Sequence, residues 1–230
     1  MTTARPDQSE TDHAGLMDAI YRRQRLIYDV TRKYYLLGRD QLISDLTPPE
    51  GGTVLEIACG TGRNLSRISA RWPERRLCGL DISDEMLTSA RSKLGNKADL
   101  AQADACDFNP EALFGVAQFD RIVLSYSLSM IPDWQGAVRE AVRHLAPGGS
   151  LHIVDFGTQA KLPTWFRRAL RAWLAKFHVS PRDDLSVALQ SITAGRPDLT
   201  YEAQSLYREY ARLEVLRRTD AGCAVGDVQD

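Results

Sequence analysis

The sequence predicts an α/β fold built on a mostly parallel β-sheet, and three observations support this. Short apolar segments alternate with amphipathic ones from Thr53 onward, which is the pattern of strands joined by crossover helices. The apolar run Val54–Ala58 breaks at Gly60-Thr61-Gly62, as expected of a strand that turns through glycines into a helix. Asp81 and Asp104 follow the next two apolar runs. A chain of 230 residues suffices for one such domain with flanking segments.

Periodicity and turn residues set the expected elements. The expected strands are Thr53–Ala58, Leu77–Asp81, Asp99–Ala103, Phe119–Ser125 and Ser150–Phe156. The expected helices are 12–33, 39–46, 62–71, 84–94, 110–114, 134–145, 163–177 and 182–193. Alternating apolar and polar residues at 199–217 predict an antiparallel hairpin at one sheet edge, with a helix as the competing interpretation.

The domain organisation follows from these elements. We expect disordered tails at 1–10 and 219–230, because both are polar and lack periodicity. An N-terminal helical region spans 11–52, and the main domain spans 53–218 with a helical insertion at 160–195.

Composition excludes several classes of protein. The net charge of −1 argues against a general nucleic-acid binder. The four cysteines have no paired spacing, which favours a reduced, cytosolic protein over a disulfide framework and makes a metal site unexpected. The polar segment 1–10 has no apolar core of a secretory signal, and no apolar run approaches the ~20 residues of a membrane span.

Polar residues at the expected strand ends predict an adenosine site. In open α/β sheets, ligands bind beyond the carboxyl ends of the strands. Asp81 can accept hydrogen bonds from both ribose hydroxyls, and Asp104 from the adenine amino group. A dinucleotide fingerprint needs a third glycine where this chain has Leu65. Glu56 would disfavour phosphates and suit a ligand with a positive amino group, so a dinucleotide oxidoreductase is a weaker alternative.

Five segments resemble the class I S-adenosylmethionine-dependent methyltransferases. They are Val54–Asn64, Leu80-Asp81, Ala103–Ala105, Phe119-Asp120 and Leu145–Leu151. The resemblance implies a Rossmann-like, seven-stranded sheet with an antiparallel last strand, and S-adenosylmethionine as cofactor. It assigns contacts with this methyl donor to Glu56, Ala58, Gly60, Gly62, Asp81, Ile82, Met86, Asp104, Ala105 and Ser125. A non-catalytic module that binds the same donor is an alternative.

The stretch Ile27–Asp40 holds three tyrosines and three cations. One interpretation is a helical hairpin with aromatic anchors and solvated charges. The other is a lid, in which Tyr28 and Tyr35 stabilise the sulfonium and a methylated ammonium by cation–π contacts. Tyr34, Arg32 and Arg39 are then candidates for substrate binding, because arginine can hold a carboxylate with two hydrogen bonds.

This stretch, together with Met17–Arg22, resembles the N-methyltransferases of betaine-lipid synthesis. That resemblance implies up to three methylations of the amine of diacylglycerylhomoserine. More broadly, the chain is similar to phosphatidylethanolamine and ubiquinone-pathway methyltransferases. The sequence offers no dedicated base, and Tyr126 and Asp155 are candidates to accept a hydrogen bond from the amine.

An apolar stripe at helical spacing runs through 162–177, with basic residues beside it and no acid. It predicts either an interfacial helix on an anionic membrane or a helix buried against the sheet. The first interpretation implies a lipid substrate and a cytoplasmic protein peripherally bound to the inner face of the membrane. The second suits a soluble small-molecule acceptor.

Overall fold

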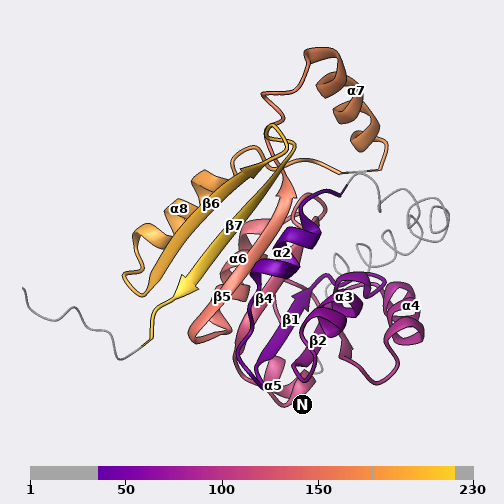
Figure 1. Ribbon diagram of the computed structural model, residues 1–230, viewed down its shortest axis with the longest axis vertical. Helices are drawn as coiled ribbons and strands as arrows, with labels where there is room; N and C mark the ends of the chain where they lie inside the picture. Colours follow the sequence, from indigo (N-terminus) through magenta and orange to yellow (C-terminus); the bar gives the residue numbers. More distant parts are fainter. Residues whose placement is uncertain (1–35, 178, 221–230) are drawn as a thin grey trace, which may run out of the picture.

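The computed structural model describes residues 36–177 and 179–220, whose strands form one twisted sheet with helices on both faces (Figure 1). The strands are β1 (Thr53–Ile57), β2 (Arg76–Asp81), β3 (Asp99–Gln102), β4 (Phe119–Ser125), β5 (Leu145–Phe156), β6 (Leu199–Leu206) and β7 (Ala211–Arg218). The helices are α2 (Arg39–Asp45), α3 (Arg63–Arg71), α4 (Asp84–Leu94), α5 (Pro110–Phe114), α6 (Trp134–Arg143), α7 (Thr164–Ala175) and α8 (Leu185–Ala194).

The strand order across the sheet is β3-β2-β1-β4-β5-β7-β6. The first five strands are parallel, and β7 pairs antiparallel with both β5 and β6. From β1 the chain proceeds outward through β2 and β3, then returns to place β4 on the other side of β1. The strand order therefore reverses between β1 and β4, and a crevice opens at their carboxyl ends.

Two apolar layers hold the sheet. One lies under α5, α6 and α8, and the other under α2, α3, α4 and α7. Helix starts follow local hydrogen bonding: the Ser83 hydroxyl accepts from the Met86 amide at the start of α4, and Asp133 accepts from Gly136 at the start of α6. These layers fix the directions in which the strand ends point.

The structure confirms the predicted fold class and the terminal hairpin. The start of the fifth strand was predicted too late. It begins at Leu145, which pairs with Phe119 before an irregularity in the register. Helix α6 accordingly ends at Arg143 rather than at 145.

Segments 1–10 and 12–33 and residues 221–230 lie outside the described residues, so those predictions remain predictions. No helix among the described residues is long and apolar enough to cross a bilayer.

Candidate functional site

A cavity opens at the carboxyl ends of β1, β2 and β4, where the strand order reverses. Its wall comes from the entry to α2, the turn after β1 and the loop after β4. The lining residues are Leu36, Arg39, Glu56, Ala58, Cys59, Gly60, Thr61, Arg63, Asn64, Asp81, Ile82, Met86, Ser125, Tyr126, Ser127, Met130 and Ile131. Most of the predicted donor contacts thus meet in one place.

The turn after β1 forms one wall of this cavity. Ala58 has a φ of 54°, a left-handed conformation that is costly for a residue with a side chain. Two hydrogen bonds hold the turn: the Cys59 amide donates to the Leu80 carbonyl, and the Gly60 amide to Asp81 Oδ2 at 2.8 Å. A Cβ on Gly60 would meet no atom within 4 Å, so the backbone faces open space there. The turn can therefore approach a ligand closely.

Glu56 is the buried acid of the cavity. Its Oε1 accepts a 2.7 Å hydrogen bond from Asn64 Nδ2. Its Oε2 is buried without a hydrogen-bond partner among the described residues. Burial raises the pKa of Glu56 to about 8, against the smaller lowering effects of Asn64 and the Arg39 charge. The carboxyl group is therefore mostly protonated at neutral pH. It can release its proton and pair with a cationic group that enters the cavity.

Asp81 anchors the rim between the first cavity and a second one. Its Oδ2 binds the Gly60 amide, and its Oδ1 accepts from the Ser83 amide at 3.0 Å. The carboxylate of Asp81 therefore has a fixed orientation at this rim. The second cavity encloses about 400 Å³ and is lined on one side by Asp104 and Ala105. Asp81 and Ile82 line both cavities, so one extended ligand can pass from one into the other.

The end of β4 supplies the opposite wall. Ser125 lines the first cavity, and its hydroxyl is buried without a partner among the described residues. Tyr126 follows with a φ of 55°, and its hydroxyl donates to the Leu37 carbonyl at 2.5 Å. Burial raises the pKa of Tyr126 well above its usual value. The Tyr126 side chain therefore fixes the entry to α2 against β4, and its ring contributes to the wall.

Asp155, the other candidate acceptor of an amine hydrogen bond, lines neither cavity. It is fully buried on β5, and its Oδ1 accepts from the Phe156 amide at 2.7 Å. Burial raises the pKa of Asp155 to about 7. Its position on the strand was predicted from the sequence, but the orientation of the carboxylate depends on the register with β7, where Asp155 lies opposite Arg212.

Of the predicted lid residues, the structure describes Arg39, which lines the first cavity. Tyr28, Arg32, Tyr34 and Tyr35 lie outside the described residues. The lid therefore remains a prediction.

Several lining residues of the first cavity had no predicted role, among them Asn64, Leu36 and Met130. Asn64 holds Glu56, and Leu36 and Met130 supply apolar surface. Asn64 lies eight residues after Glu56, on the first turn of α3 beyond the glycine turn. This spacing within a strand–turn–helix unit could have identified it.

The structure also explains Leu65, which occupies the position of the third glycine of a dinucleotide fingerprint. Leu65 is fully buried, and a Cβ built on Gly79 of β2 would lie 2.7 Å from its Cδ1. The glycine is thus on the strand rather than on the helix. In dinucleotide sites, a glycine at this helix position allows the helix to pack closely on the strand. Here the helix position holds the larger Leu65, which weighs against a dinucleotide oxidoreductase.

Comparisons with known proteins agree with this geometry. Residues 54–149 match the family described as Methyltransferase domain. A demethylmenaquinone methyltransferase of Listeria welshimeri is 30% identical over 59% of this chain and 58% of its own length. The ubiquinone/menaquinone biosynthesis C-methyltransferase of Salmonella arizonae is 34% identical over 60% of this chain and 54% of its own length. The chain thus spans a little more than half of the length of each of these two relatives.

Among solved structures, the plantazolicin methyltransferase BpumL in complex with SAH has the same fold. Its TM-score is 0.66 at 18% identity, covering 91% of this chain and 96% of that chain. This chain therefore shares the fold of a solved methyltransferase, and residues 54–149 resemble the methyltransferase family. The matched segment runs from β1 into β5 and includes the glycine turn, Asp81 and Asp104.

Proposed function

We propose that this chain transfers a methyl group from S-adenosylmethionine to an acceptor at the mouth of the first cavity. One observation carries the proposal: Glu56, with a buried oxygen that has no partner among the described residues, lies in the same cavity as Asp81, whose carboxylate holds the glycine turn. An adenosine ligand with a positive amino group satisfies both carboxylates. A phosphate would be repelled by the Asp81 carboxylate and would offer Glu56 no positive partner.

The residues of the site fit this donor. Glu56 would pair with its amino group, Asp81 with its ribose hydroxyls, and Asp104 with its adenine. Once bound, S-adenosylmethionine supplies a methyl group activated by a positively charged sulfur. The chain's main contribution is then to hold donor and acceptor in line, because alignment alone can account for much of the rate.

We propose the amine of diacylglycerylhomoserine as the acceptor. The resemblance over 17–40 supports this choice, and so does Arg39, which could hold the homoserine carboxylate. Leu36, Met130 and Ile131 give the cavity an apolar wall, which tolerates the loss of an N–H donor at each of three methylations. Asp155 lines neither cavity, so the amine proton would leave to solvent.

A quinone precursor is the second candidate acceptor. The names of the two relatives favour it, since both are methyltransferases of quinone biosynthesis. Transfer to a ring carbon would need a group that takes a proton from the ring hydroxyl, and Tyr126 already donates to the Leu37 carbonyl. We therefore place this candidate second.

Incubation with labelled methyl donor separates the candidates. The purified protein is offered diacylglycerylhomoserine and a demethylated quinol in parallel, and the products are analysed by mass. Stepwise gain of one, two and three methyl groups on the lipid supports the first proposal. Label on the quinol alone would support the quinone precursor as the acceptor instead. Label on neither would contradict both acceptors, and donor binding measured separately would then test the site itself.

A further inference from the structure

Helix α7 projects from the body of the molecule, beyond the end of β5 (Figure 1). Its inner row is fixed to the core, where Leu170 and Leu174 are buried. Trp173 and Phe177 are partly buried against the same apolar layer. The stripe predicted at 162–177 is thus divided, because part of it already supplies the contacts with the sheet.

The outer part of the stripe is uncovered. Trp165 is 72% exposed and Phe166 is 38% exposed. Their rings meet edge to face, with centroids 5.7 Å apart. Since the inner row completes the packing of α7, this aromatic pair is not needed to fill the core, and exposing it to water is unfavourable.

Basic side chains occur along α7 and at both of its ends. The sequence has no acidic residue between Asp155 and Asp183. Lys161 pairs with Glu209, and Arg171 with Asp183. In contrast, Arg167, Arg168 and Lys176 form no ion pair within residues 36–177 and 179–220. The outer face of α7 is therefore aromatic and positively charged.

The turn between β6 and β7 extends this face. Tyr207, Arg208 and Glu209 have φ values of 51°, 59° and 64°, so three consecutive residues with side chains are left-handed. Glu209 holds the turn to the segment before α7: its carboxylate accepts from the Thr158 hydroxyl, and its carbonyl from the Gln159 amide at 2.8 Å.

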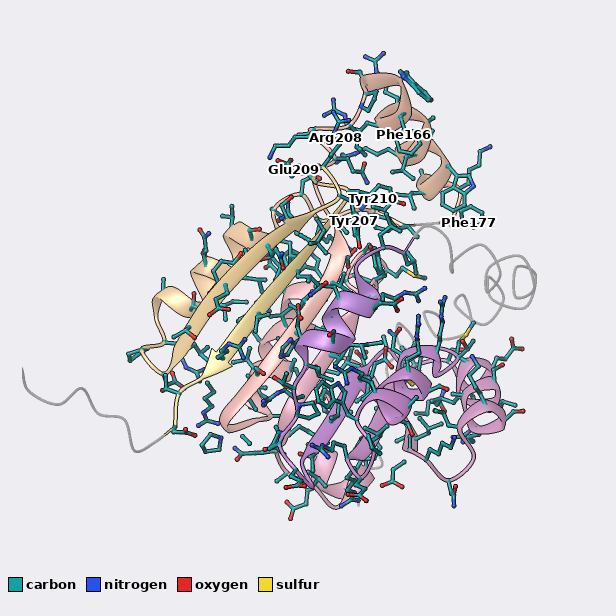
Figure 2. The ribbon with its side chains drawn as sticks, viewed as in Figure 1. Phe166, Phe177, Tyr207, Arg208, Glu209 and Tyr210 are labelled. Carbon is teal, nitrogen blue, oxygen red and sulfur yellow. The ribbon has the colours of Figure 1, made fainter. Side chains whose placement is uncertain are left out.

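As a result of this turn, Tyr207 is 56% exposed and Arg208 is exposed. Figure 2 shows both at the same end of the molecule as Phe166. The turn and α7 thus contribute aromatic and basic groups to one end.

This end also adjoins the candidate site. Phe177, two residues beyond the end of α7, packs on Met86, which lines the first cavity. The C-terminal end of α7 is therefore close to the cavity.

We propose that Trp165, Phe166, Arg167, Arg168, Lys176, Tyr207 and Arg208 form a docking surface for an anionic phospholipid bilayer. This inference rests on the proposed lipid acceptor. Aromatic rings at the polar–apolar boundary and cations toward the headgroups are the arrangement of an in-plane interfacial helix. Its positive charge is complementary to the negatively charged cytoplasmic leaflet. Docking would bring the lipid amine to the cavity without extracting the lipid into water.

Vesicle co-sedimentation of the full chain tests the surface. Vesicles of phosphatidylglycerol with phosphatidylcholine are compared with vesicles of phosphatidylcholine alone. Wild-type protein should partition onto the anionic vesicles only. The double variant Trp165→Ala/Phe166→Ala should lose roughly tenfold or more in partitioning. Arg168→Ala and Arg208→Ala should each lose roughly fivefold.

Matched controls lie away from this surface. Val187 on α8 is 66% exposed, and Lys97 is exposed between α4 and β3. Val187→Ala and Lys97→Ala should partition like wild type. Sedimentation velocity of the aromatic double variant checks whether this face joins two copies of the chain instead.

The outcomes separate the surface from the catalytic proposal, because donor binding is measured on the same proteins by calorimetry. Loss of vesicle binding with intact donor binding supports the surface. Three results would overturn the proposed surface. They are partitioning of the double variant at the wild-type level, absence of vesicle binding by the wild type, and a wild-type dimer that the double variant abolishes. Failure of wild type to bind the donor would instead refute the proposed function.

Discussion

At the scale of single residues, the site depends on carboxyl groups whose surroundings differ. Asp81 accepts two backbone amides, which fix its orientation at the rim. Glu56 is buried with one unpartnered oxygen among the described residues, and its pKa is raised to about 8. The first group is placed to bind hydroxyls, and the second to change its charge when a cation arrives.

Proton release on donor binding tests the assignment of Glu56. At pH 7 the empty site holds this carboxyl mostly protonated, and a positive amino group favours the ionised form. Calorimetry in buffers of different ionisation enthalpy should therefore show release of about one proton per donor bound. Glu56→Gln should release none. Equal proton release by both proteins would show that another group titrates.

At the scale of elements, the contact between β4 and the entry to α2 depends on one buried hydrogen bond. The Tyr126 hydroxyl donates to the Leu37 carbonyl, and Tyr126 itself has a left-handed backbone. Helix α2 begins at Arg39, two residues after Leu37, and Arg39 lines the first cavity. This hydrogen bond therefore also positions the wall of that cavity.

Tyr126→Phe should lower the free energy of unfolding by about 1–3 kcal/mol, since it leaves a carbonyl without its donor. Chemical denaturation measures the change, and Tyr207→Phe is the exposed control, with an expected change close to zero. Should Tyr126→Phe instead retain full stability and lose turnover, the hydroxyl would have a role in the reaction.

Periodicity predicted the elements well, because each strand and helix has its own apolar pattern and turn residues. The glycine turn, Asp81 and Asp104 were identifiable because parallel strands bring their ends to one edge. Contacts between distant segments were not predictable. The hydroxyl of Tyr126 donates to the carbonyl of Leu37, which is distant in the sequence. The orientation of the Asp155 carboxylate depends on how β5 pairs with β7. The stripe of α7 could not be divided into inner and outer rows before its packing was known.

At the scale of the whole molecule, buried titratable groups make stability depend on pH in opposite directions. Burial raises the pKa of Asp155 from 3.8 to about 7 and lowers that of His152 from 6.5 to about 3. The folded state holds the Asp155 proton more tightly than the unfolded state does. The contribution of Asp155 to stability is thus fully present below about pH 4 and is lost as pH rises through 7. The contribution of His152 is lost as pH falls.

Asp155→Asn isolates the first effect. The difference in unfolding free energy, wild type minus variant, should decrease as pH rises from about 4 to 7. Denaturant unfolding across this range measures it. Val154→Ala, which removes no titratable group from the same strand, should give a constant difference. A difference for Asp155→Asn that increases with pH would mean that the carboxylate is stabilised in its ionised form.

Calorimetric titration with S-adenosylmethionine tests the central claim most directly. Asp81→Ala removes both the proposed ribose contact and the anchor of the Gly60 amide, so binding should fall by roughly a hundredfold or become undetectable. Asp99→Ala, at the opposite end of the neighbouring strand, is the matched control and should bind like wild type. Unchanged affinity of Asp81→Ala would contradict the placement of the donor at the ends of β1 and β2.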